Sequence, residues 1–181
     1  MKKYIVFLRG INVGGKNKVT MPRLKAAFEE NGFKDVTTYI NSGNLLFSSD
    51  NQDTTSLKLQ SEAIIQETFD LDIPVSIISA KELAASLESV PKWWGDGDKD
   101  MIHYAIFLIP PTTASQIIEV LGEVNPEFEK LASIGNTLYW SIPRTHSNQS
   151  KWSKISSSKV NRQVTIRNAN TVKKMISLAQ K

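Results

Sequence analysis

The 181-residue chain contains no cysteine, so disulfide bonds, thiolate catalysis and cysteine-ligated metal sites are excluded. It has two histidines, His103 in an apolar run and His146 in a polar loop, and the sequence supports neither a Ser-His-Asp triad nor a histidine-rich metal site. The longest apolar run, residues 104–109, is far too short to cross a bilayer. Without a signal-type segment, we expect a cytoplasmic protein that has no cofactor, no metal and no membrane contact.

Carboxylates are missing from both ends of the chain. Residues 1–28 carry seven cations and residues 130–181 carry ten, whereas residues 29–129 carry five cations and eighteen carboxylates. A fold that brings both ends to one face would create a positive surface that attracts phosphate-bearing ligands. The alternative is that the acidic middle neutralises the basic ends within the fold.

The hydrophobic pattern of the first half predicts six elements. Strands are expected over residues 4–8, 36–40, 45–47 and 75–78, and helices from Thr20 and Pro22 to about Gly32 and over residues 54–69. The order βαββαβ is that of the ferredoxin-like fold, an antiparallel sheet with two helices on one face. We therefore predict an α+β protein whose residues 1–90 form a ferredoxin-like half.

A second α+β half follows a short linker. A further helix capped by Ser79 ends at Pro91, and residues 91–100 read as a linker rich in Gly and Asp. Residues 101–181 then predict a strand, a helix, a hairpin that turns at Gly135 and Asn136, a short strand and a closing helix. This order loosely repeats that of the first half.

A glycine-rich loop separates the first strand from the first helix. Gly10, Gly15 and Lys16 have the spacing of a phosphate-binding loop, but Asn17 stands where the magnesium-binding Ser or Thr belongs. Pro22 also places the helix start several residues too late for that motif. The loop is therefore a nucleotide-triphosphatase loop, a looser anion nest or a purely structural glycine turn.

Several separated motifs resemble those of one family. The sequences FLRGINVGG (residues 7–15), MPRL (21–24), TYINSGN (38–44) and TIRNANT (165–171) are similar to motifs of a bacterial family of unknown function, DUF family 1697. The resemblance implies a compact α+β fold built around ferredoxin-like topology. It implies no activity, substrate or cofactor.

The motif-bearing ends supply the candidate ligand-binding residues. Arg offers a planar fork for phosphate or carboxylate, Asn offers a donor and an acceptor, and Asn168 or Asn170 could cap the closing helix so that its free N–H groups face an anion. Turns and caps also use Asn, Ser and Gly for local structure alone. The candidates are Arg9, Gly10, Asn12, Gly14, Gly15, Lys16, Asn41, Ser42, Asn44, Lys154, Lys159, Arg167, Asn168 and Asn170.

The spacing of Asp96, Asp98 and Asp100 resembles the start of a calcium-binding EF-hand loop. Met101 stands where that loop needs Gly and Phe107 where it needs a bidentate Glu, so a solvated linker is favoured.

Three function classes remain after these exclusions. The leading hypothesis is a binding module for a phosphate-bearing partner, a nucleic acid or a nucleotide, on a basic face. The second is an enzyme that acts on a small phosphorylated or carboxylated substrate between the two halves. The third is a protein-interaction or oligomerisation unit built on an uncovered sheet edge.

Overall fold

The structure, a computed structural model, describes all 181 residues. The chain divides into two compact units. The first unit comprises Met1–Ala84 and Met175–Lys181, and the second comprises Ala85–Lys174. None of the helices combines the length and the apolar character that a bilayer-spanning segment needs.

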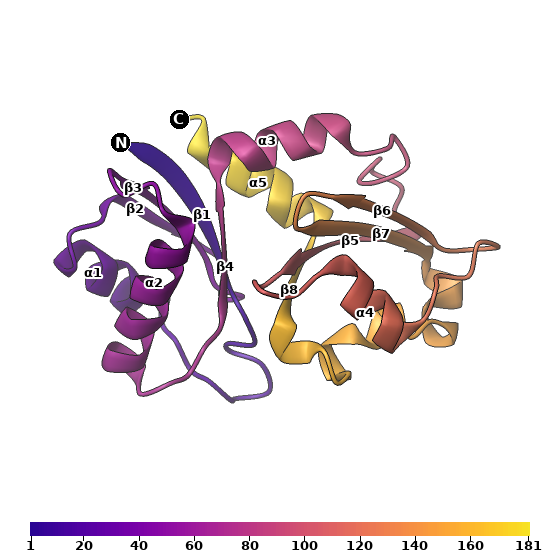
Figure 1. The fold of residues 1–181 in the computed structure, drawn as a ribbon, viewed down its shortest axis with the longest axis horizontal. Coiled ribbons are helices and arrows are strands. Elements are labelled where there is room, and N and C mark those ends of the chain that lie inside the picture. Colours follow the sequence, from indigo (N-terminus) through magenta and orange to yellow (C-terminus); the bar gives the residue numbers. More distant parts are fainter. The chain divides into compact units, whose positions relative to one another are not determined.

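The first unit has the predicted ferredoxin-like topology. Its elements are β1 (Lys2–Leu8), α1 (Met21–Glu30), β2 (Lys34–Tyr39), β3 (Asn44–Ser49), α2 (Thr54–Phe69), β4 (Val75–Ser79) and the start of α3 (Ala80–Ser89). The four strands form one antiparallel sheet in the order β2-β3-β1-β4. Figure 1 shows α1 and α2 together on one face of this sheet.

Local signals explain where these helices begin. Pro22 lies in the first turn of α1, where its missing N–H costs nothing. The side chain of Asp53 accepts a hydrogen bond from the backbone N–H of Thr55 and caps α2. Ser79 and Glu82 form a reciprocal capping box at the start of α3.

The second unit repeats the topology of the first. Its elements are β5 (Met101–Leu108), α4 (Ala114–Leu121), β6 (Lys130–Ile134), β7 (Thr137–Pro143), three 3₁₀ segments η1 (Arg144–Gln149), η2 (Trp152–Ser157) and η3 (Asn161–Gln163), β8 (Val164–Asn168) and the start of α5 (Ala169–Ala179). The sheet order β6-β7-β5-β8 matches β2-β3-β1-β4 element by element. The 3₁₀ segments occupy the place in the chain that α2 has in the first unit, and the predicted loose repeat is confirmed.

A buried carboxylate ties the 3₁₀ segments to the sheet of the second unit. The Glu129 side chain accepts hydrogen bonds from Trp140 Nε1 (3.1 Å) and from the hydroxyl of Ser150. Its other oxygen accepts from the backbone N–H of Asn125 at 2.7 Å. Both carboxylate oxygens of the buried Glu129 therefore have hydrogen-bond partners. These bonds hold Ser150, and the nearby Trp152, against the core of the second unit.

One strand boundary differs from the prediction. We expected Ile40 to end the second strand, but β2 stops at Tyr39 and Ile40 lies in the turn with a φ of 50°. A β-branched residue rarely adopts a positive φ, so the tight turn that ends at Gly43 overrides the β preference of Ile40. Ile40 is 48% exposed as a result.

Candidate functional site

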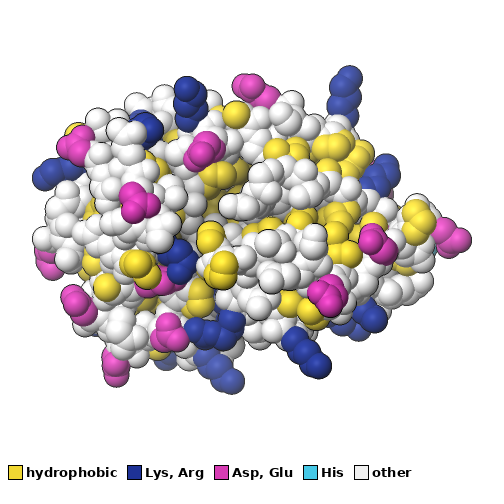
Figure 2. Space-filling model, in the orientation of Figure 1, with side chains coloured by type: hydrophobic (Ala, Val, Ile, Leu, Met, Phe, Trp, Pro, Cys, Tyr) yellow, Lys and Arg dark blue, Asp and Glu magenta, His cyan; other side chains and the backbone are white.

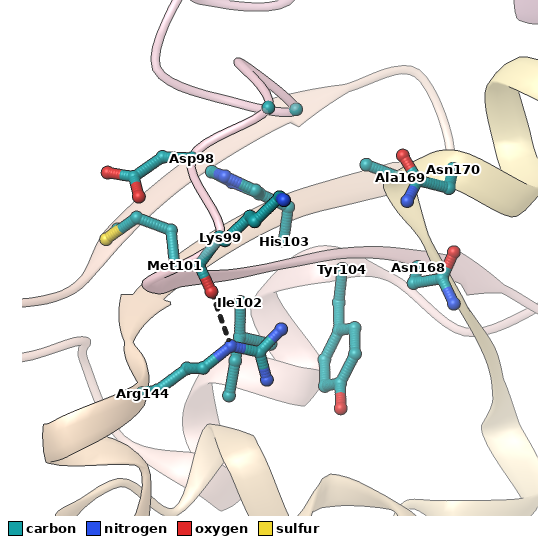
Figure 3. A pocket seen from close by; sticks show the side chains of 12 residues that line it. Asp98, Lys99, Met101, Ile102, His103, Tyr104, Arg144, Asn168, Ala169 and Asn170 are labelled. Atoms are coloured by element: carbon teal, nitrogen blue, oxygen red, sulfur yellow. Dashed lines mark hydrogen bonds between the residues drawn. The ribbon is translucent and has the colours of Figure 1, made fainter.

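The second unit contains a pocket that follows from unequal strand lengths. β5 begins at Met101, but β8 pairs with it only from Tyr104, opposite Asn168, to Leu108. The chain then turns into α5, so the edge of β5 from Met101 to His103 has no strand beside it on that side. A cavity of about 390 Å³, here called the α5 pocket, lies there (Figure 3). It is lined by Gly95, Gly97, Asp98, Lys99, Met101, Ile102, His103, Tyr104, Arg144, Asn168, Ala169 and Asn170.

The N-terminus of α5 forms one wall of this pocket. The Asn168 Oδ1 atom accepts a 2.9 Å hydrogen bond from the N–H of Thr171 and caps the helix. The N–H groups of Ala169 and Asn170 lie in the first turn, where no helix carbonyl precedes them. The first turn of α5 contains no acidic residue, whereas the corresponding helix α3 of the first unit carries Glu82 there. The wall is therefore electropositive.

Two cations approach the pocket from the other side. The Nε atom of Arg144 donates a 2.8 Å hydrogen bond to the carbonyl oxygen of Lys99, which leaves its Nη groups available. Neither Arg144 nor Lys99 forms an ion pair with a carboxylate. Figure 3 shows both side chains directed toward the space across which Asn168 and Asn170 lie, with the Asp98 carboxylate turned away from it.

The loop over residues 95–99 is fixed in place as a further wall. Trp94 Nε1 donates a 2.9 Å hydrogen bond to the carbonyl oxygen of Tyr104, and Lys173 Nζ donates to the carbonyl oxygen of Gly95. Asp96 Oδ1 lies 3.1 Å from His103 Nε2 and accepts a 3.0 Å hydrogen bond from the N–H of Asp98. The pocket is thus bounded by backbone that is held at several points.

The pKa of the Asp96 carboxyl is lowered. The main cause is the hydrogen bond from the N–H of Asp98, and the neighbouring His103 lowers it further, while desolvation opposes the shift. Asp96 is therefore a carboxylate at neutral pH and an acceptor for the His103 ring.

His103 lines the pocket but is not a free base. Its Nδ1 atom lies 2.5 Å from the hydroxyl of Ser141, and its Nε2 atom lies beside Asp96. Ser141 is fully buried, so this Ser-His-Asp chain offers no accessible nucleophile. Because both ring nitrogens are engaged, the arrangement fastens the loop to β5 and does not resemble a poised acid–base pair.

In the first unit, the glycine loop forms a small hairpin. The N–H of Asn12 bonds to the carbonyl of Asn17 at 3.0 Å, and the N–H of Lys16 bonds to the carbonyl of Val13 at 3.0 Å. Gly14 and Gly15 form its turn with φ values of 58° and 74°. This hairpin, residues 12–17, is held by its own backbone hydrogen bonds, and Lys16 is exposed on it.

The Asn side chains of the first unit hold this hairpin and its neighbouring turn. Asn12 Nδ2 donates to the carbonyls of Val19 and Asn41, each at 2.8 Å, and therefore joins the two motif segments. Asn44 is fully buried and donates to the carbonyl of Tyr39 at 2.8 Å and to the hydroxyl of Ser42 at 3.0 Å. The structure brings the predicted residues of the two segments together, and these bonds give the amides local structural roles.

Gly43 fixes the same turn by close packing. A Cβ atom at this position would lie 2.6 Å from Ile11 Cδ1 and 2.9 Å from Leu8 Cβ, and its φ is 86°. Only glycine meets both conditions.

The predicted residues of the second unit separate into two groups. Asn168 and Asn170 line the α5 pocket, whereas Lys154, exposed on η2, and Lys159, exposed in the turn between η2 and η3, lie outside it. Arg167 is 7% exposed and donates to Thr165 Oγ1 and to the carbonyl of Ile166. Burial lowers the pKa of Arg167 to about 10, so its guanidinium stays charged at neutral pH.

Lys99, Tyr104 and Arg144 were not among the site residues predicted from the sequence. Tyr104 reads as one member of an apolar strand, and Arg144 as one of ten cations after residue 129. The pairing of β5 with both β7 and β8 places them around one cavity, and no local sequence signal carries these registers.

The surface charges do not separate by sign on the face that Figure 2 shows. Lys and Arg side chains are interspersed with Asp and Glu over each unit on this face.

Known proteins confirm the fold and the family. The solved structure of the conserved bacterial protein SP0830 from Streptococcus pneumoniae is similar to this chain, with 29% sequence identity, a TM-score of 0.84 and coverage of 98% of each chain. None of the curated proteins matches. The family model described as "Protein of unknown function (DUF1697)" matches residues 1–139, which is most of the chain. The resemblance found in the motifs is confirmed, and the chain belongs to the DUF1697 family.

Proposed function

We propose that the second unit binds a small phosphate-bearing molecule in the α5 pocket. The observation that carries this proposal is the convergence of the α5 N-terminus, Lys99 and Arg144 on one cavity with neither cation paired to a carboxylate. Helix N–H groups and an Arg fork are the donors that phosphate oxygens accept best in proteins.

The size of the pocket favours a small ligand over a polymer. A volume of about 390 Å³ lies at the lower end of the range for small-molecule sites. A nucleic-acid interface would instead need a long exposed groove or stripe of cations. Binding of RNA through the exposed Lys154 and Lys159 is therefore the competing outcome and not the leading one.

The hydrogen bonds of His103 favour binding over catalysis. The only histidine at the pocket has both ring nitrogens engaged, and the adjacent Ser141 is inaccessible. A group that abstracts a proton from a ligand would need a free nitrogen or carboxylate within hydrogen-bond reach.

Isothermal titration calorimetry at low ionic strength tests the proposal. The titrants are AMP and its uncharged counterpart adenosine, and the proteins are the wild type, Lys99→Gln and the matched control Lys154→Gln. Each variant removes one lysine charge from the second unit, but only Lys99 lines the pocket. We expect AMP to bind, adenosine to bind at least tenfold more weakly, and only Lys99→Gln to weaken AMP.

Two results would overturn the proposal. If AMP, ribose 5-phosphate and inorganic phosphate all fail to bind, the pocket is not a phosphate site. If a single-stranded RNA oligonucleotide binds in a salt-dependent way and Lys154→Gln weakens it while Lys99→Gln does not, the exposed cations are the functional surface instead.

A further inference from the structure

We infer that the α5 pocket recognises a phosphomonoester that carries a planar ring, with the ring placed against Tyr104. This inference rests on the proposed function and adds to it the chemical class of the ligand. The observation behind it is that a rigid aromatic side chain lies beside the electropositive wall of the same cavity (Figure 3).

Tyr104 is held from behind by buried groups. Its ring packs against that of Trp140, with the centroids 5.5 Å apart and an angle of 31° between the planes. Trp140 is fully buried and is itself fixed by its hydrogen bond to Glu129. Because the ring of Tyr104 is supported in this way, little side-chain entropy is lost when a ligand packs against its cavity side.

The sheet register places this ring next to the phosphate donors. Tyr104 pairs directly with Asn168 across β5 and β8, so their Cα atoms are about 5 Å apart and their side chains lie on the same face of the sheet. Asn168 is also the residue from which α5 begins. If the phosphate of a ligand binds at the first turn of α5, the part of the ligand attached to that phosphate therefore lies next to Tyr104.

The remaining surroundings of Tyr104 suit an aromatic ring with polar edges. Ile102 lies two residues earlier on the same strand face, and Met101 also lines the cavity, so the wall around the ring is partly apolar. The hydroxyl of Tyr104 and the side-chain amide of Asn170 form no hydrogen bond within the protein. Nucleobases combine a stacking face with donors and acceptors at the edge, and they match this lining.

The experiment compares ribose 5-phosphate with the four nucleoside 5′-monophosphates by calorimetry. The proteins are the wild type, Tyr104→Leu and Tyr104→Phe, each as the full chain with its fold checked by circular dichroism. We expect at least one nucleotide to bind about tenfold more tightly than ribose 5-phosphate. Tyr104→Phe retains most of this advantage, whereas Tyr104→Leu reduces the ratio between the affinities for that nucleotide and for ribose 5-phosphate to less than threefold.

The outcomes separate the inference from the proposed function. If ribose 5-phosphate binds as tightly as every nucleotide, the site is a phosphate site without ring recognition and the inference is wrong. The same conclusion follows if Tyr104→Leu keeps the full nucleotide advantage. If none of the five ligands binds to the wild type, the proposed function itself fails. Because the ratio of the two affinities is compared within each protein, a change that affects phosphate binding alone does not alter the comparison.

Discussion

The Nε atom of Arg144 donates a 2.8 Å hydrogen bond to the backbone carbonyl of Lys99, so one cation of the α5 pocket fixes the backbone of the other. Arg144 follows β7 and Lys99 precedes β5, and the two strands pair so that Met101 lies opposite Pro143. The antiparallel register thus brings together two cations that are far apart in sequence. Because the guanidinium is oriented by this bond, its Nη groups are prearranged for an anion.

Arg144 variants test this arrangement. Arg144→Gln removes the charge and the fork, and we expect the affinity for AMP to fall by about ten- to a hundredfold, the equivalent of one or two charge-assisted hydrogen bonds. Arg144→Lys keeps the charge but cannot bond to Lys99 and also offer a fork, so its affinity lies between those of the wild type and Arg144→Gln. Calorimetry with AMP measures both. Equal affinities of all three proteins would show that Arg144 does not contact the ligand.

Substitutions of Asn168 separate helix capping from ligand binding. Asp caps a helix as well as Asn does, so Asn168→Asp keeps the free energy of unfolding within about 0.5 kcal/mol of the wild type. The same change places a negative charge at the pocket, and we expect the affinity for AMP to fall at least tenfold. Urea denaturation and calorimetry provide the two measurements.

Asn168→Ala is the complementary control. It removes the cap on Thr171 and lowers the free energy of unfolding by about 1 kcal/mol. If the Asn168→Asp variant bound AMP as tightly as the wild type, the phosphate of AMP would not bind beside Asn168.

Two glycine substitutions in the first unit test whether close packing at Gly43 adds to the cost of its positive φ. Gly43→Ala combines a positive φ with close contacts to Leu8 and Ile11, and we expect it to lower the free energy of unfolding by about 2–4 kcal/mol. Gly14→Ala has a positive φ but no neighbouring atom within 4 Å, so it costs only about 1–2 kcal/mol. Chemical denaturation of both variants compares them. Equal losses of unfolding free energy in the two variants would show that the close contacts of Gly43 add nothing to the cost of its positive φ.

The lowered pKa of Asp96 predicts an acid-dependent loss of stability. The ionised carboxylate is favoured in the folded protein, so its contribution is present above the ordinary value of 3.8 and is lost as the pH falls through the lower folded-state pKa. Carbon-detected NMR titration of the side-chain carboxyl should give a midpoint below 3.8. In Asp96→Asn this part of the acid loss disappears. A midpoint at or above 3.8 would show that the bonds to Asp98 and His103 do not favour the charged form.

Local sequence signals predicted most of the fold. The apolar run of β1, Pro22 at the start of α1 and the turn at Gly135 and Asn136 each act through neighbouring residues, and the structure has elements at all three places. The repeat of the sheet order follows from the same element order in both halves. Ile40 is the exception, because the close packing of Gly43 decides the turn and no local preference shows it.

Local sequence signals indicated only some of the residues that line the α5 pocket. The sequence indicated Asn168 and Asn170 because an Asn beside a helix start is a local cap signal. It did not indicate Tyr104, Lys99 or Arg144, because their positions depend on how β5 pairs with β7 and on where β8 stops along β5. Asn12 and Asn44 were selected for their chemistry, but their amides hold backbone carbonyls that only the folded chain brings near.

Chemical-shift mapping with AMP on the ¹⁵N-labelled full chain can locate the anion site directly. We expect saturable shifts at the backbone amides of Lys99, Ala169 and Asn170, with the amides of the hairpin over residues 12–17 unchanged. Saturable shifts confined to that hairpin, or no saturable shift anywhere, would contradict an anion site at the start of α5.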